Sequence, residues 1–198
     1  MTNNFFEIQN GNFSASEKNK VNNVNLVIEK QGEIISLLGP SGIGKTTILR
    51  TIAGLQKLSE GRIKLRDKIL ASDDIHIEPE KRNVALSFQD NSLFPNYKVI
   101  DNINFGEKRT NGHGSSVDVK EIIELLRIEP ILEKYPHQIS AGEAQRVSLA
   151  RSLMSKPDLL LLDEPFSNID QSLKEEIQVS VKKLLKRINL TTIIVTHD

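Results

Sequence analysis

The most apolar stretches of the chain are short and lie far apart in the sequence. They are residues 33–38 (EIISLL), 84–88 (VALSF), 159–163 (LLLLD) and 191–195 (TTIIV). Short runs of continuously apolar residues are typical of strands that are covered on both faces. We therefore expect a mainly parallel central sheet in an α/β fold.

A helical pattern separates the last two of these runs. Its apolar residues recur at the spacing of one helix face, and Asp170 precedes them as a candidate cap. The apolar positions are Leu173, Ile177, Val181, Leu184, Leu185 and Ile188. The order strand, helix, strand is the one that places two strands parallel in one sheet.

Two other regions depart from this pattern. Residues 5–9, 24–28 and 61–70 alternate or are rich in β-branched side chains, which predicts an N-terminal antiparallel β subdomain. Residues 91–156 contain no convincing buried strand, and Asp118 precedes an apolar helical stripe at a cap position. We interpret 91–156 as an α-helical subdomain inserted into a single domain that spans residues 1–198.

Composition removes several classes of function. Lysine plus arginine equal aspartate plus glutamate at 26 each, so no global field attracts nucleic acid, and no nucleic-acid partner is expected. The chain contains no cysteine, which excludes disulfides and cysteine-based chemistry. The first residues lack the pattern of a secretory signal, and the longest strictly apolar run is LLLL, so any membrane role requires a partner.

The segment between residues 39 and 47 carries the strongest chemical signal. It reads GPSGIGKTT and matches G-x-x-x-x-G-K-[ST] between an apolar run and a helical pattern. Backbone amides of such a loop bind phosphate oxygens at a helix N-terminus. The predicted nucleotide-binding residues are Gly39, Pro40, Ser41, Gly42, Ile43, Gly44, Lys45, Thr46 and Thr47. Lys45 would lie at the β/γ-phosphates and Thr46 would bind Mg²⁺; the alternative is a glycine-rich turn with a surface lysine.

Two adjacent acids end the third apolar run. Asp163 and Glu164 lie at the carboxyl end of a predicted sheet strand, the edge where open α/β sheets bind ligands. Consecutive strand residues point to opposite faces, so the two carboxylates can have different roles. Asp163 suits Mg²⁺ and Glu164 suits activation of water. Solvated charges at the end of a strand are the alternative.

Five segments in order give the chain its resemblance to a family. GPSGIGKTT, SFQD, ISAGEAQRVSLARSL, LLLLDEPFSNID and TIIVTHD resemble the nucleotide-binding subunits of ATP-binding cassette (ABC) transporters over almost the whole chain. The resemblance implies a P-loop NTPase fold, ATP and Mg²⁺ as ligands, and ATP hydrolysis. By the same resemblance, Gln89 reaches Mg²⁺ or the lytic water, and His197 contacts the γ-phosphate and helps to hold Glu164.

The resemblance also implies a second copy of the chain. The family signature, usually Leu-Ser-Gly-Gly-Gln, corresponds here to ISAGE, in which Ser140 and Gly142 are retained and Ala141 replaces a glycine. In the family the signature of one protomer faces the ATP of the other, so an ATP-dependent homodimer is expected. Residues 167–170 match a family segment called the D-loop, and Asp170 in it is expected to touch the opposite protomer. Phe13 is the nearest aromatic candidate for stacking on adenine.

The expected function follows from these matches. Residues 92–106 and the segment before the signature resemble bacterial importer cassettes of the iron(III), sulfate, polyamine and thiamine group. Integral membrane permease subunits are the implied partners, with a solute-binding protein acting through the permease, at the cytoplasmic face of the membrane. Family members continue past the histidine that corresponds to His197, whereas this sequence stops at Asp198. A non-transport ABC ATPase and a catalytically impaired regulatory module are the alternatives.

Overall fold

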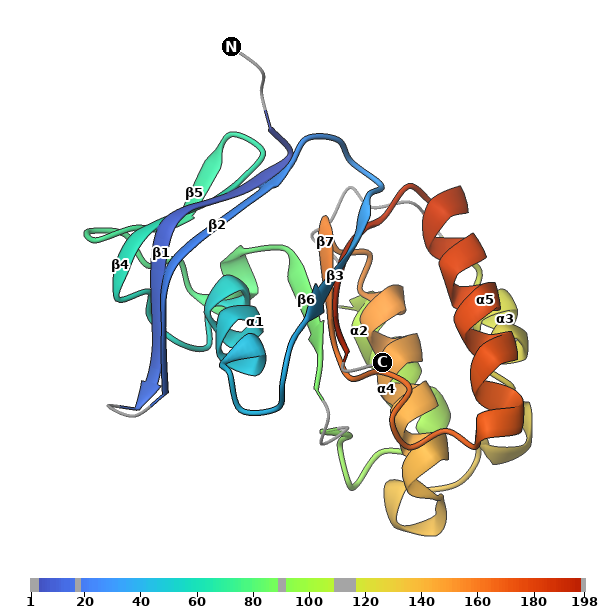
Figure 1. The fold of residues 1–198 in the computed structure, drawn as a ribbon. Helices are drawn as coiled ribbons and strands as arrows, with labels where there is room; N and C mark the ends of the chain where they lie inside the picture. Colours follow the sequence, from blue (N-terminus) through green and yellow to red (C-terminus); the bar gives the residue numbers. More distant parts are fainter. Residues whose placement is uncertain (1–3, 17–18, 89–91, 109–116, 197–198) are drawn as a thin grey trace.

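The computed structural model describes residues 4–16, 19–88, 92–108 and 117–196. Its strands form two separate sheets (Figure 1). The antiparallel sheet has the order β2-β1-β4-β5 and contains β1 (Phe6–Ser16), β2 (Asn19–Ile28), β4 (Glu60–Leu65) and β5 (Lys68–Ala71). The parallel sheet has the order β3-β8-β7-β6 and contains β3 (Ile34–Leu38), β6 (Val84–Ser87), β7 (Leu159–Asp163) and β8 (Thr191–Thr196). Both predicted sheets, and the α/β fold, are confirmed.

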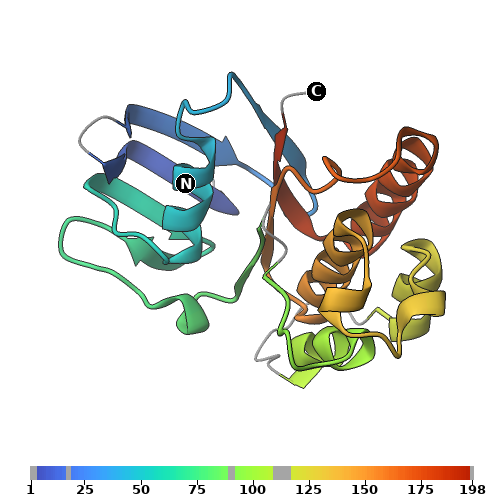
Figure 2. The same cartoon turned by 90° about the horizontal axis from the view of Figure 1, so that it is seen from below.

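The helices divide between the two faces of the parallel sheet. Helix α1 (Lys45–Ala53) lies between the two sheets, whereas α4 (Ala141–Met154) and α5 (Gln171–Arg187) lie on the other side (Figures 1 and 2). Helices α2 (Val99–Lys108) and α3 (Val119–Leu125) pack beside α4 and α5. Among the described residues, short 3₁₀ helices cover Pro79–Lys81, Glu129–Ile131 and Pro136–Gln138. The described residues between 91 and 156 thus form helices and no strand, as the sequence indicated.

Strand β7 is the centre of the hydrophobic core. Leu159 and Leu161 pack into the cluster around α1, and Leu160 and Leu162 pack into the cluster around α4 and α5. All four leucines are fully buried, and burial of each contributes roughly 1.5–3 kcal/mol. Asp163 is the last residue of β7 and continues this alternation, so its side chain is expected on the α1 side of the sheet with Leu159 and Leu161.

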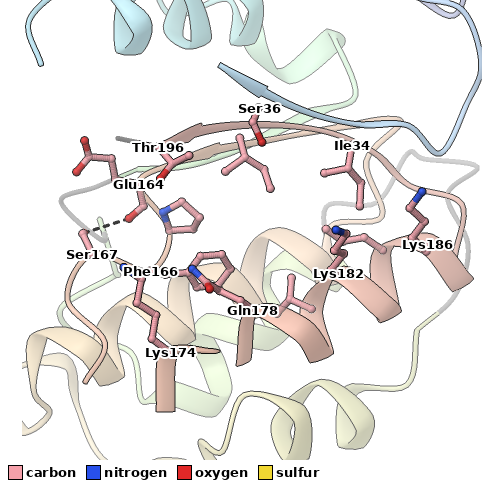
Figure 3. A pocket seen from close by; sticks show the side chains of 14 residues that line it. Ile34, Ser36, Glu164, Phe166, Ser167, Lys174, Gln178, Lys182, Lys186 and Thr196 are labelled. Carbon is pink, nitrogen blue, oxygen red and sulfur yellow. Dashed lines mark hydrogen bonds between the residues drawn. The ribbon is translucent and has the colours of Figure 1, made fainter. Parts of the chain in front are cut away.

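Strand β3 differs from the expectation of burial on both faces. Ser36 is exposed and Leu38 is 68% exposed. The reason is position, because β3 lies at the end of the strand order with β8 as its one neighbour among the described strands. A groove of about 640 Å³ lies between β3, β8 and α5, and Ile34 and Ser36 contribute to its wall (Figure 3).

Of the two predicted helix caps, Asp118 and Asp170, the structure shows one. The Asp118 side chain accepts a hydrogen bond from the Lys120 backbone N–H at 2.9 Å, so Asp118 caps α3 as expected. Asp170 occupies the cap position of α5, but its side chain makes no capping hydrogen bond. That part of the Asp170 prediction is wrong. The carboxylate instead lies close enough to Arg146 to act on its pKa. None of the described helices is long and apolar enough to cross a bilayer.

Candidate functional site

The glycine-rich loop connects β3 to α1 and delivers the chain into the first helical turn. Gly44 precedes α1 with φ 102°, a left-handed conformation that favours glycine. A Cβ at Gly44 would also lie 2.2 Å from Cγ2 of Val21 in the neighbouring sheet. Backbone angle and space both require glycine here. The first-turn N–H groups of α1 lack helical partners and carry the positive end of the helix dipole, so the turn favours an anion.

Lys45 lies inside this loop. Its Nζ donates to the carbonyl oxygens of Gly39 at 2.5 Å and Pro40 at 2.9 Å, and the residue is 9% exposed. The stem of the side chain is thereby enclosed while the ammonium group stays at the loop carbonyls. The first turn of α1 contains no acidic residue that would compete with an anionic ligand.

Asp163 and Thr46 meet across the loop although they are more than a hundred positions apart in the sequence. Asp163 is 4% exposed, and burial raises the pKa of its carboxyl group. A side-chain hydrogen bond with Thr46 opposes that rise in pKa, as do the charges of Arg50 and Lys45 to a smaller extent. The Asp163 side chain therefore points to the α1 side of the sheet, as the alternation along β7 requires.

Glu164 begins the turn after β7 and adopts a left-handed conformation with φ 48°. Its backbone N–H donates to Val195 O at 3.0 Å, and its carbonyl accepts from Ser167 Oγ at 3.1 Å. Glu164, Ser167 and Thr196 line the same end of the groove between the sheet and α5 (Figure 3). Asp163 thus lies beside Thr46 and Glu164 lines the groove, and the Glu164 charge is near enough to add to the rise in the Asp163 pKa.

The signature segment forms the start of α4. Ser140 and Glu143 make a capping box, in which Glu143 N–H donates to Ser140 Oγ at 3.2 Å and Ser140 N–H donates to Glu143 Oε2 at 2.7 Å. The hydrogen bond from the Ser140 backbone lowers the pKa of Glu143. The Ser140 hydroxyl accepts the Glu143 N–H in this box, and a side-chain hydrogen bond between Ser140 and Glu143 further lowers the pKa of Glu143.

A close contact within the chain requires glycine at position 142. A Cβ at this position would lie 2.5 Å from the carbonyl oxygen of Asn168, which is shorter than any normal contact. The first turn of α4 therefore packs directly on the backbone between β7 and α5. Sequence reasoning assigned Gly142 to a ligand of the second protomer and did not anticipate this contact.

A family model described as ABC transporter matches residues 21–167. The matched range includes the glycine-rich loop, the signature and the two acids at the end of β7. The chain belongs to the ABC transporter family.

Individual relatives agree with the importer resemblance. The chain is 40% identical over 197 residues to an Fe(3+) ions import ATP-binding protein of Escherichia coli, covering 98% of this chain and 55% of the relative. It is 43% identical over 173 residues to a trehalose/maltose import ATP-binding protein of Thermococcus litoralis, covering 85% of this chain and 46% of the relative. The chain spans about half the length of the curated relatives it matches.

A solved ABC cassette shares the fold. A dimeric ATP-binding cassette in a post-hydrolysis state, bound to ADP and Pi, is 29% identical to this chain with a TM-score of 0.80. The match covers 98% of this chain and 88% of that chain. The predicted P-loop NTPase fold is confirmed.

The structure of this ABC cassette corrects the prediction that Phe13 stacks on adenine. Phe13 has no exposed surface and belongs to the core cluster around α1. Its ring packs over Gly11, where a Cβ would lie 2.7 Å from Phe13 Cε2. Because the inward direction of β1 buries both ring faces, Phe13 cannot stack on a base in this structure. Gln89 and His197, two other predicted site residues, lie outside the described residues.

Two buried polar residues were missed by sequence reasoning. Arg82 is 2% exposed and donates from Nη1 to the carbonyls of Thr51 and Ile52 at 2.8 and 2.9 Å. It thus holds the C-terminal end of α1, and burial lowers its pKa to about 10. Gln145 is 1% exposed and binds the backbone after β7. A lone arginine in a polar turn gives no sequence signal, and neither does a glutamine within the signature segment.

Proposed function

We propose that this ABC cassette binds Mg²⁺ and ATP and hydrolyses ATP to power an importer. The observation that carries the proposal is the meeting of Lys45, Thr46 and Asp163 at the N-terminus of α1, with Glu164 directly after Asp163. A cation, a dipole-bearing helix end, a hydroxyl and two carboxylates are the groups that phosphoryl transfer to water requires. The relatives' names as import ATP-binding proteins support the same activity.

The residues present fit a magnesium ion. Mg²⁺ binds hard oxygen ligands and usually takes one or two carboxylates together with phosphate oxygens. Thr46 and Asp163 supply a hydroxyl and a carboxylate already in contact, and Gln89 is the proposed additional ligand. Among the described residues there is no group of three or more acidic or histidine side chains that would hold a metal by itself. The donor set therefore suits an ion that arrives with a polyphosphate. When bound, Mg²⁺ neutralises charge on the β- and γ-phosphates.

Each side chain then has one task. The amides of residues 42–47 and the ammonium group of Lys45 bind the phosphates. We assign to Glu164 the orientation of the attacking water and the acceptance of its proton, because Glu164 directly follows Asp163 at the carboxyl end of β7, the edge where such sheets bind ligands. We propose that His197 contacts the γ-phosphate from the residue after Thr196.

A second copy of the chain completes the site. We assign Ser140 and Gly142 of one protomer to the ATP of its partner, with Asp170 at the contact between protomers. The dimeric state of the solved cassette supports this arrangement. In this mechanism ATP holds two cassettes together and hydrolysis separates them.

The remaining partners follow from the importer relatives. We propose that residues 1–198 form a single ABC domain that attaches to integral membrane permease subunits at the cytoplasmic face, with a solute-binding protein acting through the permease. Phe94 and Tyr97 are exposed in part and form a small aromatic cluster with Phe105 within the predicted inserted subdomain. Exposed aromatic residues are enriched at protein interfaces, so this cluster suits contact with a partner.

The test is an ATP-trapped dimer. Glu164→Gln preserves shape and phosphate binding but removes the general base, so the variant with Mg²⁺ and ATP should elute as a dimer in size-exclusion chromatography. Lys45→Ala is the matched control, since it removes the ammonium charge that binds the phosphates and should remain monomeric with weak ATP binding. A monomeric Glu164→Gln variant that binds ATP would contradict the dimer mechanism, and unchanged ATP affinity in Lys45→Ala would contradict the phosphate loop.

A further inference from the structure

The side-chain amide of Gln145 bridges α4 and the backbone that follows β7. Its Nε2 donates to the carbonyl of Glu164 at 2.9 Å and to Ser167 Oγ at 3.2 Å. Its Oε1 accepts from the Asn168 N–H at 3.0 Å. The residue is 1% exposed, so these bonds form away from solvent.

The partners allow one orientation of this amide. The Glu164 carbonyl can only accept a hydrogen bond, and the Asn168 N–H can only donate one. A glutamine satisfies both together, whereas a carboxylate at the same place would face the Glu164 carbonyl with a second acceptor. The pattern therefore requires an amide and not merely a polar group.

The bridge acts on the backbone of the residue to which water activation is assigned. Glu164 holds a left-handed conformation with φ 48°, which is unfavourable for a residue with a side chain. Its carbonyl receives hydrogen bonds from both Gln145 and Ser167, and its N–H is bound to β8. These contacts hold the turn in which the carboxylate is displayed.

The same helix carries the signature at its start. Gly142 packs against the Asn168 carbonyl so closely that a Cβ would lie at 2.5 Å, one helical turn before Gln145. Helix α4 is therefore fastened to residues 164–168 by a close backbone contact and by the amide bridge. These contacts connect the signature residues Ser140 and Gly142 to the Glu164 turn.

We infer that Gln145 is a positioning residue, which holds the Glu164 turn in the geometry for water activation and couples it to the signature on the same helix. The inference rests on the proposed function, since it concerns the hydrolysis assigned to Glu164. Gln145 has no contact with the phosphate loop among its hydrogen bonds, so its effect falls on turnover and not on nucleotide affinity.

The experiment compares three variants of the full chain. Gln145→Glu keeps the acceptor for Asn168 and removes the donor to Glu164, and Gln145→Met keeps the length without either. Ser152→Ala is the matched control, because Ser152 is a buried residue of α4 whose hydroxyl donates within the helix to Ser148 O at 3.0 Å. For each protein, kcat and KM for ATP are measured together with the Kd of a nonhydrolysable ATP analogue.

The expected result is a split between the kinetic constants. Both Gln145 variants should lose about 10- to 100-fold in kcat, the effect of a misplaced reacting group, with KM and Kd within about threefold of the parent. Ser152→Ala should match the parent. Unchanged kcat in Gln145 variants that bind the analogue would overturn the inference, as would an equal loss in Ser152→Ala. Loss of analogue binding in both Gln145 variants would assign the residue to stability alone. A parent that binds ATP without hydrolysing it overturns the proposed function and the inference together.

Discussion

The contact between Gly44 and Val21 allows a quantitative test of how the phosphate loop is held. Gly44→Ala places a side chain at φ 102°, and the left-handed region costs about 1–2 kcal/mol for a residue with a Cβ. The new methyl would also lie 2.2 Å from Val21 Cγ2, and relief of such an overlap costs about 1–3 kcal/mol. We expect Gly44→Ala to lower the free energy of unfolding by about 2–5 kcal/mol.

A double-mutant cycle separates these two costs. The same new methyl would lie 3.7 Å from Val21 Cβ, an ordinary contact, so Val21→Ala removes the overlap and leaves the backbone strain. In the Val21→Ala background, Gly44→Ala should therefore cost about 1–2 kcal/mol. The coupling between the two positions should be about 1–3 kcal/mol.

The measurement is urea denaturation of the parent, both single variants and the double variant. Equal costs of Gly44→Ala in the two backgrounds would show that Val21 does not limit the space at the loop. A cost near zero in the Val21→Ala background would refute the left-handed conformation at Gly44. Either result would contradict the loop geometry on which the phosphate site depends.

The remaining predictions concern Asp163 and Arg82. Burial raises the Asp163 pKa, so the charged carboxylate lowers the stability of the folded protein above that pKa. At neutral pH, Asp163→Asn should therefore unfold at a higher urea concentration than the parent. This gain should vanish at pH values below the ordinary aspartate pKa, where the carboxyl group is protonated in both the folded and the unfolded state. With nucleotide, the same variant should lose the increase in melting temperature that Mg²⁺ gives the parent, and an undiminished Mg²⁺ effect would exclude Asp163 as a ligand. Arg82→Lys keeps a charge but has a single donor nitrogen in place of the guanidinium that bonds Thr51, Ile52 and Ile77, so it should lower the free energy of unfolding by about 1–3 kcal/mol. An unfolding midpoint equal to that of the parent would show that these bonds do not stabilise the end of α1.

Hydropathy along the chain was sufficient to separate the two sheets. The continuously apolar runs became the parallel sheet, and the alternating segments became the antiparallel one. Burial of β3 was overestimated, because a local pattern does not contain the strand order that leaves β3 at one end. The phosphate loop and the pair of acids were recognisable because their spacing along the chain is itself the chemical requirement.

Residue roles that depend on direction or on distant partners needed the structure. Phe13 was chosen for its place before the phosphate loop, but the pleat of β1 turns its ring into the core. Gly142 was assigned to a ligand, and its packing on Asn168 becomes visible only when α4 lies against the turn after β7. Gln145 was not chosen at all, although it binds residues from 19 to 23 positions away.

The sequence by itself determined which segments form strands and helices, where the phosphate loop begins, and to which family the chain belongs, since these features are encoded by short-range periodicity and spacing. Tertiary structure alone decided that Asp163 turns to Thr46, that Glu164 lines the groove, that Arg82 closes the end of α1, and that an amide from α4 holds the Glu164 backbone. These contacts join segments that are adjacent only after the sheet and helices have packed, and no periodicity within one segment can specify the partner that another segment supplies.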